Sequence, residues 1–285
     1  MIRTNTHPIP QLPFILAQCE QDMLFRLQHN QASLFHLNSG GNRSRAKLCI
    51  EAGSALQLTT KSIVAMACTV ELLHNASLVH DDLQDSEDTR RGRQSIWRKY
   101  GKSHAICAGD LMISAAYGAL ADVGSHPMLS KLLVHTNEAV SITIQGQSRD
   151  INADSNITEQ QYEEIAAMKS GPLIQLTLGL PLLMAGHQEH VKISNQALHK
   201  FAIAYQIVDD LKDWQQDLQH GQLNLINLLA EKCSIEEAIC FAQNRAEYLL
   251  KQCDRELAVL PSNCAASVIE ASRNLLLKAN EGTYG

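Results

Sequence analysis

A long stretch without proline limits the folds open to this chain. No proline occurs between Pro13 and Pro127, so several helices can form there without a residue that breaks them. Within this stretch, apolar residues recur at three- and four-residue steps from Lys61 to Asp85, which is the spacing of one helix face. Runs of alternating apolar and polar residues, which would indicate strands, are not found, and aromatic residues make up only 5%. The sequence therefore predicts an all-α fold.

The same spacing predicts the positions of the helices. They are expected at residues 14–36, 61–85, 104–123, 128–150, 158–185, 201–213, 234–260 and 264–279. Two of them begin with the pattern of a capping box, Thr158 with Gln161 and Ser234 with Glu237. Loops are expected at residues 39–42, 90–99, 150–156 and 216–224. No linker or internal repeat separates these segments, so residues 1–285 are predicted to form a single domain.

Charge and cysteine content exclude several classes of protein. The net charge is −6 and there is no basic block, so nucleic-acid binding is not expected. The eight cysteines are scattered without a CxxC pair, and no secretory signal is evident. They are expected to be reduced thiols in a cytoplasmic protein. No apolar run approaches the length of a membrane span, so no transmembrane segment is expected.

Two acidic clusters each follow an apolar helical stripe. Asp81 and Asp85 lie four residues apart, so their carboxylates share one helix face, and Asp82 flanks them. The same pattern returns at Asp209, Asp210 and Asp213. Carboxylates this close repel one another, and some would bind protons unless a cation neutralised them. Hard oxygen ligands suit Mg²⁺. A solvated acidic face is the alternative for one such cluster, but two copies favour a metal site.

Arginines follow the first acidic cluster. Arg90, Arg91 and Arg93 lie within twelve residues of Asp81. Guanidinium groups match the oxygens of a phosphate, so acid and base together fit an anion held partly by metal and partly by arginine. Surface salt bridges are the alternative role for these arginines.

The segments that carry these residues resemble those of one enzyme family. The segment from His74 to Asp85, HNASLVHDDLQD, followed by Arg90-Arg91-Gly92, resembles the first aspartate-rich motif of trans-polyprenyl diphosphate synthases. The segment from Tyr205 to Asp213, YQIVDDLKD, resembles their second. Shorter matches lie between them in the family order, at Gly109-Asp110, Gln145-Gly146-Gln147 with Asp150, and Lys169-Ser170. The similarity covers roughly residues 35–230.

The resemblance implies a fold and a reaction. The fold is a bundle of antiparallel helices around a deep central cavity, usually in a homodimer. The reaction is Mg²⁺-dependent chain elongation, in which diphosphate leaves an allylic substrate such as geranyl or farnesyl diphosphate. The double bond of isopentenyl diphosphate attacks the resulting cation, and a proton is lost. Metal ions stabilise the charge of the leaving diphosphate, and an apolar cavity excludes water that would quench the cation.

The resemblance also assigns roles to single residues. The metal-binding positions are Asp81, Asp82, Asp85, Asp209, Asp210 and Asp213. The positions that hold the allylic diphosphate are Arg90 and Lys169, with Ser170 and Gln206 beside them. The positions that hold isopentenyl diphosphate are Arg45, His74 and Arg91, next to Asn42 and Arg43 of the N-terminal loop. The residues expected to carry catalysis are Asp81, Asp82, Asp85, Arg90, Lys169 and Asp209.

Two cations of the family pattern are missing. The N-terminal loop of the family reads Gly-Gly-Lys-Arg, whereas Asn42 stands here in place of the lysine. The loop after the second cluster is short and carries Gln222 where a further lysine is usual. These departures leave two alternatives to chain elongation. One is an enzyme that passes the allylic cation to another acceptor or cyclises it, as class I terpene synthases do. The other is a non-catalytic partner subunit, which the complete clusters disfavour because unused carboxylates repel one another.

Product length is predicted from the residues before the first cluster. Ala76 and Ser77 lie five and four residues before Asp81, a little more than one turn away, and one turn of about 5.4 Å is close to the length of an isoprene unit. In the family that the chain resembles, the product channel runs alongside this helix, and short-chain members often place aromatic residues at this depth as a floor. Both side chains here are small, so the resemblance implies a deeper floor and a product of C20 or longer. Tyr117 is the residue that could close the channel earlier.

Overall fold

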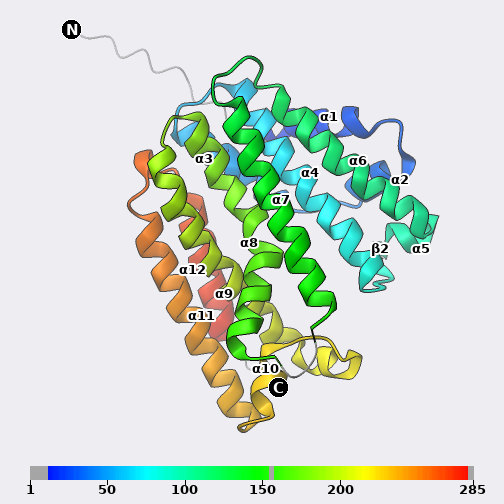
Figure 1. Ribbon diagram of the computed structural model, residues 1–285, viewed down its shortest axis with the longest axis vertical. Coiled ribbons are helices and arrows are strands. Elements are labelled where there is room, and N and C mark those ends of the chain that lie inside the picture. Colours follow the sequence, from blue (N-terminus) through cyan, green and yellow to red (C-terminus); the bar gives the residue numbers. More distant parts are fainter. Residues whose placement is uncertain (1–11, 154–156, 282–285) are drawn as a thin grey trace. The chain divides into compact units, whose positions relative to one another are not determined.

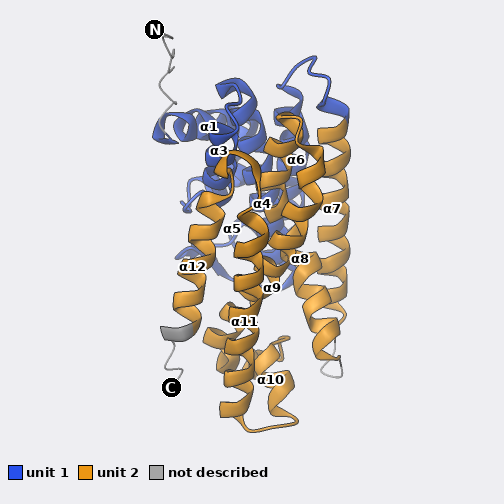
Figure 2. Ribbon diagram, turned by 90° about the vertical axis from the view of Figure 1, so that its left-hand side faces the viewer, with its two compact units in different colours: residues 1–130 blue, residues 131–285 orange. Residues whose placement is uncertain are grey.

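The computed structural model describes residues 12–153 and 157–281. Within these residues the chain forms twelve α-helices, a short 3₁₀-helix and one two-stranded hairpin (Figure 1). The predicted all-α fold is confirmed. The helices belong to two compact units, residues 1–130 and 131–285, each of which is described by itself (Figure 2). That the whole chain forms one domain stays a prediction.

The first unit is built on a central helix. Its elements are α1 (Leu12–Leu27), α2 (Gln31–Leu37), α3 (Ser44–Ala55), α4 (Thr60–Gln84), β1 (Thr89–Arg90), β2 (Arg93–Gln94), α5 (Ile96–Tyr100) and α6 (Lys102–Ala121). Helix α4 packs against α1, α3 and α6. It begins where the hydroxyl of Thr59 accepts a hydrogen bond from the Ser62 amide at 3.2 Å, as an N-cap does. Its residues Met66, Val70 and Leu72 are completely buried, so α4 forms the core of this unit.

The second unit surrounds a long helix. Its elements are α7 (Leu129–Ile151), α8 (Glu159–Met184), α9 (Gln188–His220), α10 (Leu225–Ala230), α11 (Ile235–Leu257), the 3₁₀-helix η1 (Pro261–Asn263) and α12 (Ala266–Glu281). Helix α9 packs against α8, α10, α11 and α12. Both predicted capping boxes are present, Thr158 with Gln161 at the start of α8 and Ser234 with Glu237 at the start of α11.

Several predicted boundaries were wrong. The helix expected at 14–36 is two helices, because the side chain of Asn30 accepts a hydrogen bond from the Ser33 amide and starts α2. Helix α9 is longer than the predicted 201–213, and it continues into the predicted loop 216–224 until Gly221 ends it with a φ of 65°. The short helices α3, α5 and α10 and the hairpin of β1 and β2 were not predicted. Residues 154–156 of the predicted loop 150–156 lie outside the described residues.

Two helices are long and apolar enough to cross a membrane by length and composition alone. They are α4 and α6, and 78% and 39% of their most apolar stretches are buried within the protein. A core helix that packs against other helices passes the same test, so this result is weak support for a membrane span. The absence of a transmembrane segment stays a prediction.

Gly146 allows α7 and α8 to approach closely. A Cβ atom at this position would lie 2.5 Å from the backbone nitrogen of Lys169 and 2.5 Å from the backbone carbon of Met168. We therefore expect Gly146→Ala to destabilise the protein by about 1–3 kcal/mol, because backbone atoms cannot move aside as a side chain can. The matched control is Gly171→Ala on α8, where a Cβ would meet Ala202 at an ordinary 3.5 Å. The denaturation midpoint in urea should fall for Gly146→Ala and stay or rise for Gly171→Ala. Equal midpoints would contradict this account of the helix contact.

Candidate functional site

The three carboxylates of the first cluster lie in different environments at the end of α4. Asp81 is half-buried, Asp85 is exposed at the C-cap, and Asp82 is only 1% exposed. Because Asp81 and Asp85 are one turn apart, they share the accessible face of the helix, whereas Asp82 points to the interior. The predicted cluster thus contains two accessible carboxylates and one buried carboxylate.

The hairpin that follows α4 supplies the partner of Asp82. The nitrogen Nε of Arg90 donates to Oδ1 of Asp82 at 2.7 Å, and Nη2 donates to the same oxygen. Arg90 ends β1, and the turn residues Arg91 and Gly92 have φ values of 54° and 73°, as a two-residue hairpin turn requires. Burial raises the pKa of Asp82, and the hydrogen bonds and charge of Arg90 lower it. The Oδ2 atom of Asp82 is buried and has no hydrogen-bond partner among the described residues.

Arg45 and His74 form a pair between α3 and α4. Nη1 of Arg45 lies 2.9 Å from Nε2 of His74. Arginine has only donors, so Nε2 accepts and the ring carries its proton on Nδ1. Burial lowers the pKa of His74 well below its usual value, and the neighbouring Arg45 and Arg91 lower it further. The histidine is therefore neutral, and it can donate from Nδ1 to an anion.

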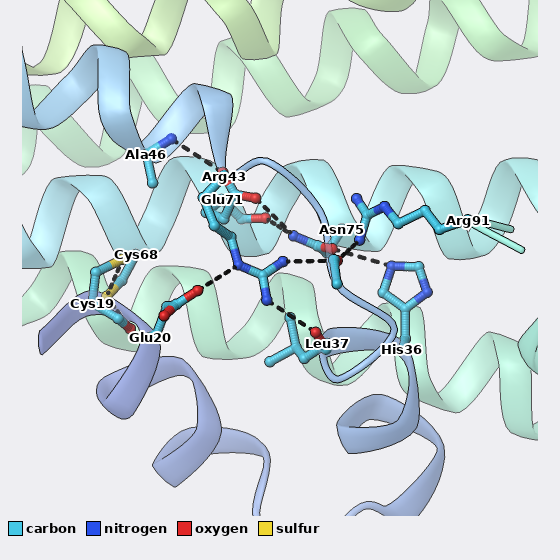
Figure 3. A network of polar contacts seen from close by, with 11 residues as sticks. Cys19, Glu20, His36, Leu37, Arg43, Ala46, Cys68, Glu71, Asn75 and Arg91 are labelled. Atoms are coloured by element: carbon cyan, nitrogen blue, oxygen red, sulfur yellow. Dashed lines mark hydrogen bonds and ion pairs between the residues drawn. The ribbon is translucent and has the colours of Figure 1, made fainter. Parts of the chain in front are cut away.

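The N-terminal loop is held by two arginines. Arg43 donates to Glu20 at 3.2 Å and to the carbonyl oxygen of Leu37 at 2.9 Å, and its side chain is only 10% exposed. Arg91 donates to the carbonyl oxygen of Gly40. Its guanidinium group lies so close to Gly41 that a Cβ there would come within 2.6 Å of Cζ. Arg43 thus ties the loop to Glu20 of α1 and to Leu37 at the end of α2 (Figure 3). Arg91 lies against the loop glycines.

A network of buried polar side chains lies next to Arg43 and Arg91, the two arginines that hold this loop (Figure 3). The Glu71 carboxylate, 1% exposed, accepts a hydrogen bond from the Ala46 amide in the first turn of α3 at 3.1 Å. The side-chain amide of Asn75 donates to the backbone oxygen of Glu71 at 2.7 Å, so Oδ1 of Asn75 accepts from Nε2 of His36 at 3.1 Å. Burial and the nearby Arg91 lower the pKa of His36 to about 4. The network therefore joins α2, α3 and α4 with a neutral histidine.

In the second unit, Lys169 of α8 binds a carboxylate of α7. Its Nζ lies 2.6 Å from Oδ2 of Asp150, and both side chains are about one-quarter exposed. Ser170, the next residue, is half-buried. Gly146, where α7 and α8 approach closely, lies one helical turn before Asp150 of this ion pair. The structure thus brings together the residues of the predicted motifs around Gln145, Asp150 and Lys169.

The second acidic cluster repeats the arrangement of the first. On α9, Asp209 is half-buried, Asp213 is exposed, and Asp210 is only 2% exposed. Asp209 accepts a hydrogen bond from Lys212 at 2.9 Å. The two accessible carboxylates again lie four residues apart on one helix face.

The buried Asp210 has donors on both oxygens. Its Oδ1 accepts from Nε2 of Gln206 at 2.9 Å, and its Oδ2 accepts from the hydroxyl of Tyr162 and from the Leu225 amide, each at 2.7 Å. Leu225 is the first residue of α10, so the carboxylate lies at that helix N-terminus, where negative charge is favourable. Burial raises the pKa of Asp210 to about 7, while these three hydrogen bonds lower it. Gln206, predicted to lie beside the allylic diphosphate, thus binds Asp210.

Four residues of the site were not singled out from the sequence. They are Glu71, Asn75, Tyr162 and Asn224. Asn224 caps α10 and donates to the carbonyl oxygen of Asp210 at 3.0 Å. A signal existed for Glu71, which is an acidic residue in the middle of an apolar helix and requires a buried partner. A signal also existed for Asn224, which stands as an N-cap residue directly before the apolar run of α10. No such pattern marks Tyr162, whose partner Asp210 lies 48 residues away in sequence.

The predicted chain-length residues lie in the first unit. Ala76 of α4 is 1% exposed, so it packs in the core. Ser77 is half-buried and lies one turn before Asp81 on the same helix face. Its hydroxyl donates to the carbonyl oxygen of His74 at 2.9 Å. Tyr117 of α6 is half-buried, and burial raises its pKa.

Tyr162 offers a test of how Asp210 is held. We expect Tyr162→Phe to destabilise the protein by about 1–3 kcal/mol, because the change leaves a buried carboxylate with one donor fewer. The matched control is Tyr248→Phe on α11, where the side chain is 55% exposed and the effect should stay within about 0.5 kcal/mol. Urea denaturation of both variants measures the difference. Equal stabilities would show that the hydroxyl contributes nothing to holding Asp210.

The sequence of this chain matches a family of known proteins. Residues 28–255 match the family model described as polyprenyl synthetase. The chain is 30% identical over 214 residues to the geranylgeranyl diphosphate synthase of Methanosarcina mazei, covering 69% of this chain and 65% of that protein. The chain thus spans a little less than two thirds of that relative's length.

Solved structures share the fold. The geranylgeranyl pyrophosphate synthetase of Geoglobus acetivorans aligns with a TM-score of 0.82 and 23% identity, covering 93% of this chain and 99% of that chain. A polyprenyl synthase of Caulobacter crescentus, complexed with calcium and isoprenyl diphosphate, aligns with a TM-score of 0.81 and 18% identity, covering 94% and 95%. At these identities the likeness shows the fold alone. The family match extends over most of the sequence and includes both aspartate clusters, and on this ground the chain belongs to the polyprenyl synthetase family.

Proposed function

We propose that this protein is a Mg²⁺-dependent prenyltransferase that condenses isopentenyl diphosphate with an allylic diphosphate, geranyl or farnesyl, to give a trans-polyprenyl diphosphate. The observation that carries the proposal is the repeated cluster, in which two accessible aspartates flank one buried aspartate that has its own donors. The name of the curated relative, a geranylgeranyl diphosphate synthase, supports the same reaction class.

The residues present fit a metal ion. Asp81 and Asp85 on α4, and Asp209 and Asp213 on α9, offer carboxylates in pairs on an accessible helix face. Next to Asp81 and Asp85, the buried Oδ2 of Asp82 has no hydrogen-bond partner among the described residues. Both oxygens of Asp210 already accept hydrogen bonds, so we assign it to holding α10. Mg²⁺ at these carboxylates would stabilise the negative charge that develops on a leaving diphosphate.

Cationic and neutral donors of the first unit fit a second diphosphate. Arg45 and Arg91 supply positive charge, and neutral His74 supplies a donor at Nδ1. Burial, and after it the nearby Arg43, lower the pKa of Arg91, so its positive form would be stabilised by further negative charge. A diphosphate would supply that charge. We assign Arg43 to loop support because its guanidinium group donates to Glu20 and to backbone oxygens.

The absence of the family's lysine at position 42 supports a second candidate function. Asn42 is exposed at the loop, where the family pattern has a lysine, so affinity for isopentenyl diphosphate would be lower than with that cation. In the second candidate, the allylic cation passes to another acceptor or cyclises. Incubation of the purified protein with Mg²⁺, isopentenyl diphosphate and each allylic primer separates the two. Linear products longer than the primer support elongation, and cyclic products support the second candidate.

We also propose a homodimer in the cytoplasm. All eight cysteines are free, as in a reducing compartment. Helix α7 exposes large apolar side chains, among them Val134, Ile142 and Ile144, which a partner subunit on this helix would cover. Sedimentation of the purified protein measures the oligomeric state, and a monomer at all concentrations would contradict the dimer.

The first functional prediction concerns metal dependence. Asp81→Ala should lower the rate by about 100-fold or more, the size expected for losing an electrostatic catalytic element. The fold should survive, since the change relieves repulsion with Asp85. The control is Glu247→Ala, a carboxylate on α11 that pairs with Lys251, which should keep the wild-type rate. Wild-type activity should vanish in excess EDTA and return with Mg²⁺, and activity that persists in EDTA would contradict the metal assignment.

The second concerns product length. The wild type should extend a farnesyl primer to C20 or longer, and Ser77→Phe should cut the product back towards C15, because its ring would lie one turn from Asp81 on the same helix face. Ser77→Ala is the control and should keep the wild-type product. Ala76→Phe is a less clean probe, since Ala76 is 1% exposed and a ring there would overpack the core. A wild type that stops at C15, with no change in Ser77→Phe, would place the channel elsewhere.

A further inference from the structure

Three potential metal ligands meet where α8 turns into α9, at the opposite end of α9 from its aspartate cluster. They are His187, Glu189 and His190, and their ligand atoms all lie within 4.8 Å of one another. Oε1 of Glu189 lies 3.6 Å from Nδ1 of His187 and 3.1 Å from Nδ1 of His190. The ring centroids of the two histidines are 5.8 Å apart. Two imidazoles thus converge on one carboxylate oxygen.

The backbone fixes the positions of these residues. Gly186 turns the chain with a φ of 84°, and the His187 amide donates to the carbonyl oxygen of Leu182 at 2.8 Å. His187 is the N-cap of α9, and the His190 amide donates to its carbonyl oxygen at 3.1 Å. The side chain of Gln188 is turned to α7, where it accepts a hydrogen bond from Lys131 at 2.6 Å. The three ligands therefore project from a defined turn rather than from a loose loop.

Two of the three distances between ligand atoms are close to those around one small ion. Nitrogen and oxygen ligands at about 2.0–2.1 Å from a tetrahedral zinc ion lie about 3.3 Å from one another. The two measured nitrogen-to-oxygen distances, 3.6 and 3.1 Å, lie on either side of that value. The side chains are between 27% and 66% exposed, so an ion and a fourth ligand from solvent have access.

We infer that His187, Glu189 and His190 form a binding site for a borderline divalent cation, Zn²⁺ in the first place, which joins the turn after α8 to the first turn of α9. Two imidazoles and one carboxylate suit Zn²⁺, Ni²⁺ and Cu²⁺, whereas Mg²⁺ prefers oxygen ligands. Three protein ligands leave one position to water or a small anion. The N-terminus of α9 carries a partial positive charge, which weakens the binding of a cation and strengthens the binding of that anion.

This site is separate from the proposed magnesium site on α9. Glu189 and Asp209 lie on the same continuous helix, and twenty residues of helix span about 30 Å. Failure of one assignment therefore leaves the other untouched. The different preferences of the ligands also allow both kinds of site to be studied in the same protein, since excess Mg²⁺ fills carboxylate sites without competing for imidazole.

The test measures zinc binding by the full-length protein in excess Mg²⁺, by competition with a chromophoric chelator. The variants are His187→Ala, His190→Ala and Glu189→Gln. The matched control is His220→Ala, an exposed histidine at the other end of α9. We expect zinc affinity to fall by about tenfold or more in each of the three variants. Even the loss of a group that only hydrogen-bonds to a metal ligand lowers metal affinity by about 10- to 100-fold. The control should bind as the wild type does.

Thermal unfolding supplies an independent reading. Zinc should raise the melting temperature of the wild type and of His220→Ala, because a ligand that binds only the folded state stabilises it. The shift should be lost in His187→Ala and His190→Ala, which should melt like the wild type without zinc. Equal zinc affinity in all variants would assign the binding to thiols or aspartates and overturn the proposal. Displacement of the wild-type zinc by Mg²⁺ would overturn it as well.

Discussion

A carboxylate can leave water only if other groups replace its hydration, and the described part of this chain buries three of them. Glu71 and Asp82 are 1% exposed and Asp210 is 2% exposed. Each has its own donor, which is the Ala46 amide for Glu71, Arg90 for Asp82, and Tyr162 with the Leu225 amide for Asp210. Removing the charged partner of a buried ion pair such as Arg90 and Asp82 costs about 3–5 kcal/mol in other proteins, and removing one neutral donor costs about 1–3 kcal/mol. The segments that carry the donors are therefore held as firmly as the helices that carry the acids.

These three acids determine where the short elements of the fold lie. Glu71 of α4 accepts from the first turn of α3, whose N-cap Arg43 has no side-chain cap of its own. Asp210 of α9 accepts from the first residue of α10. In both cases a long central helix supplies the negative charge that a short helix requires at its N-terminus. Asp82 holds the hairpin in the same way through Arg90, and the hairpin turn then carries Arg91 to the loop glycines. The accessible aspartates and the anion-binding residues of each unit are placed by the same buried contacts.

The sequence predicted the long helices and the two clusters because both follow from periodicity. It did not separate the roles within a cluster, although a signal was present. On α4 the buried positions Leu72, Val79 and Asp82 continue one stripe at helical steps, and on α9 the stripe runs from Ile203 through Ile207 to Asp210. The middle aspartate therefore belongs to the apolar face, while the outer pair does not. The donors could not be predicted, because Tyr162 and Leu225 are separated from Asp210 by 48 and 15 residues and reach it only through tertiary packing. The short helices α3, α5 and α10 were missed because five to twelve residues give too little periodicity to mark a helix.

Charge balance explains why the histidines of the first unit can lie among arginines. His36 and His74 are close to Arg91, and a second positive charge there would be repelled. Each ring instead stays neutral and has its tautomer fixed by one partner, the Asn75 oxygen for His36 and the Arg45 donor for His74. His36 then donates inward from Nε2, and His74 keeps its proton on Nδ1. The arginines retain their charge for an anion, and the two neutral histidines do not add to the repulsion among them. A lysine at position 42, as in the family pattern, would add another charge to this group, so its replacement by Asn42 lowers both the repulsion within the loop and the attraction for a diphosphate.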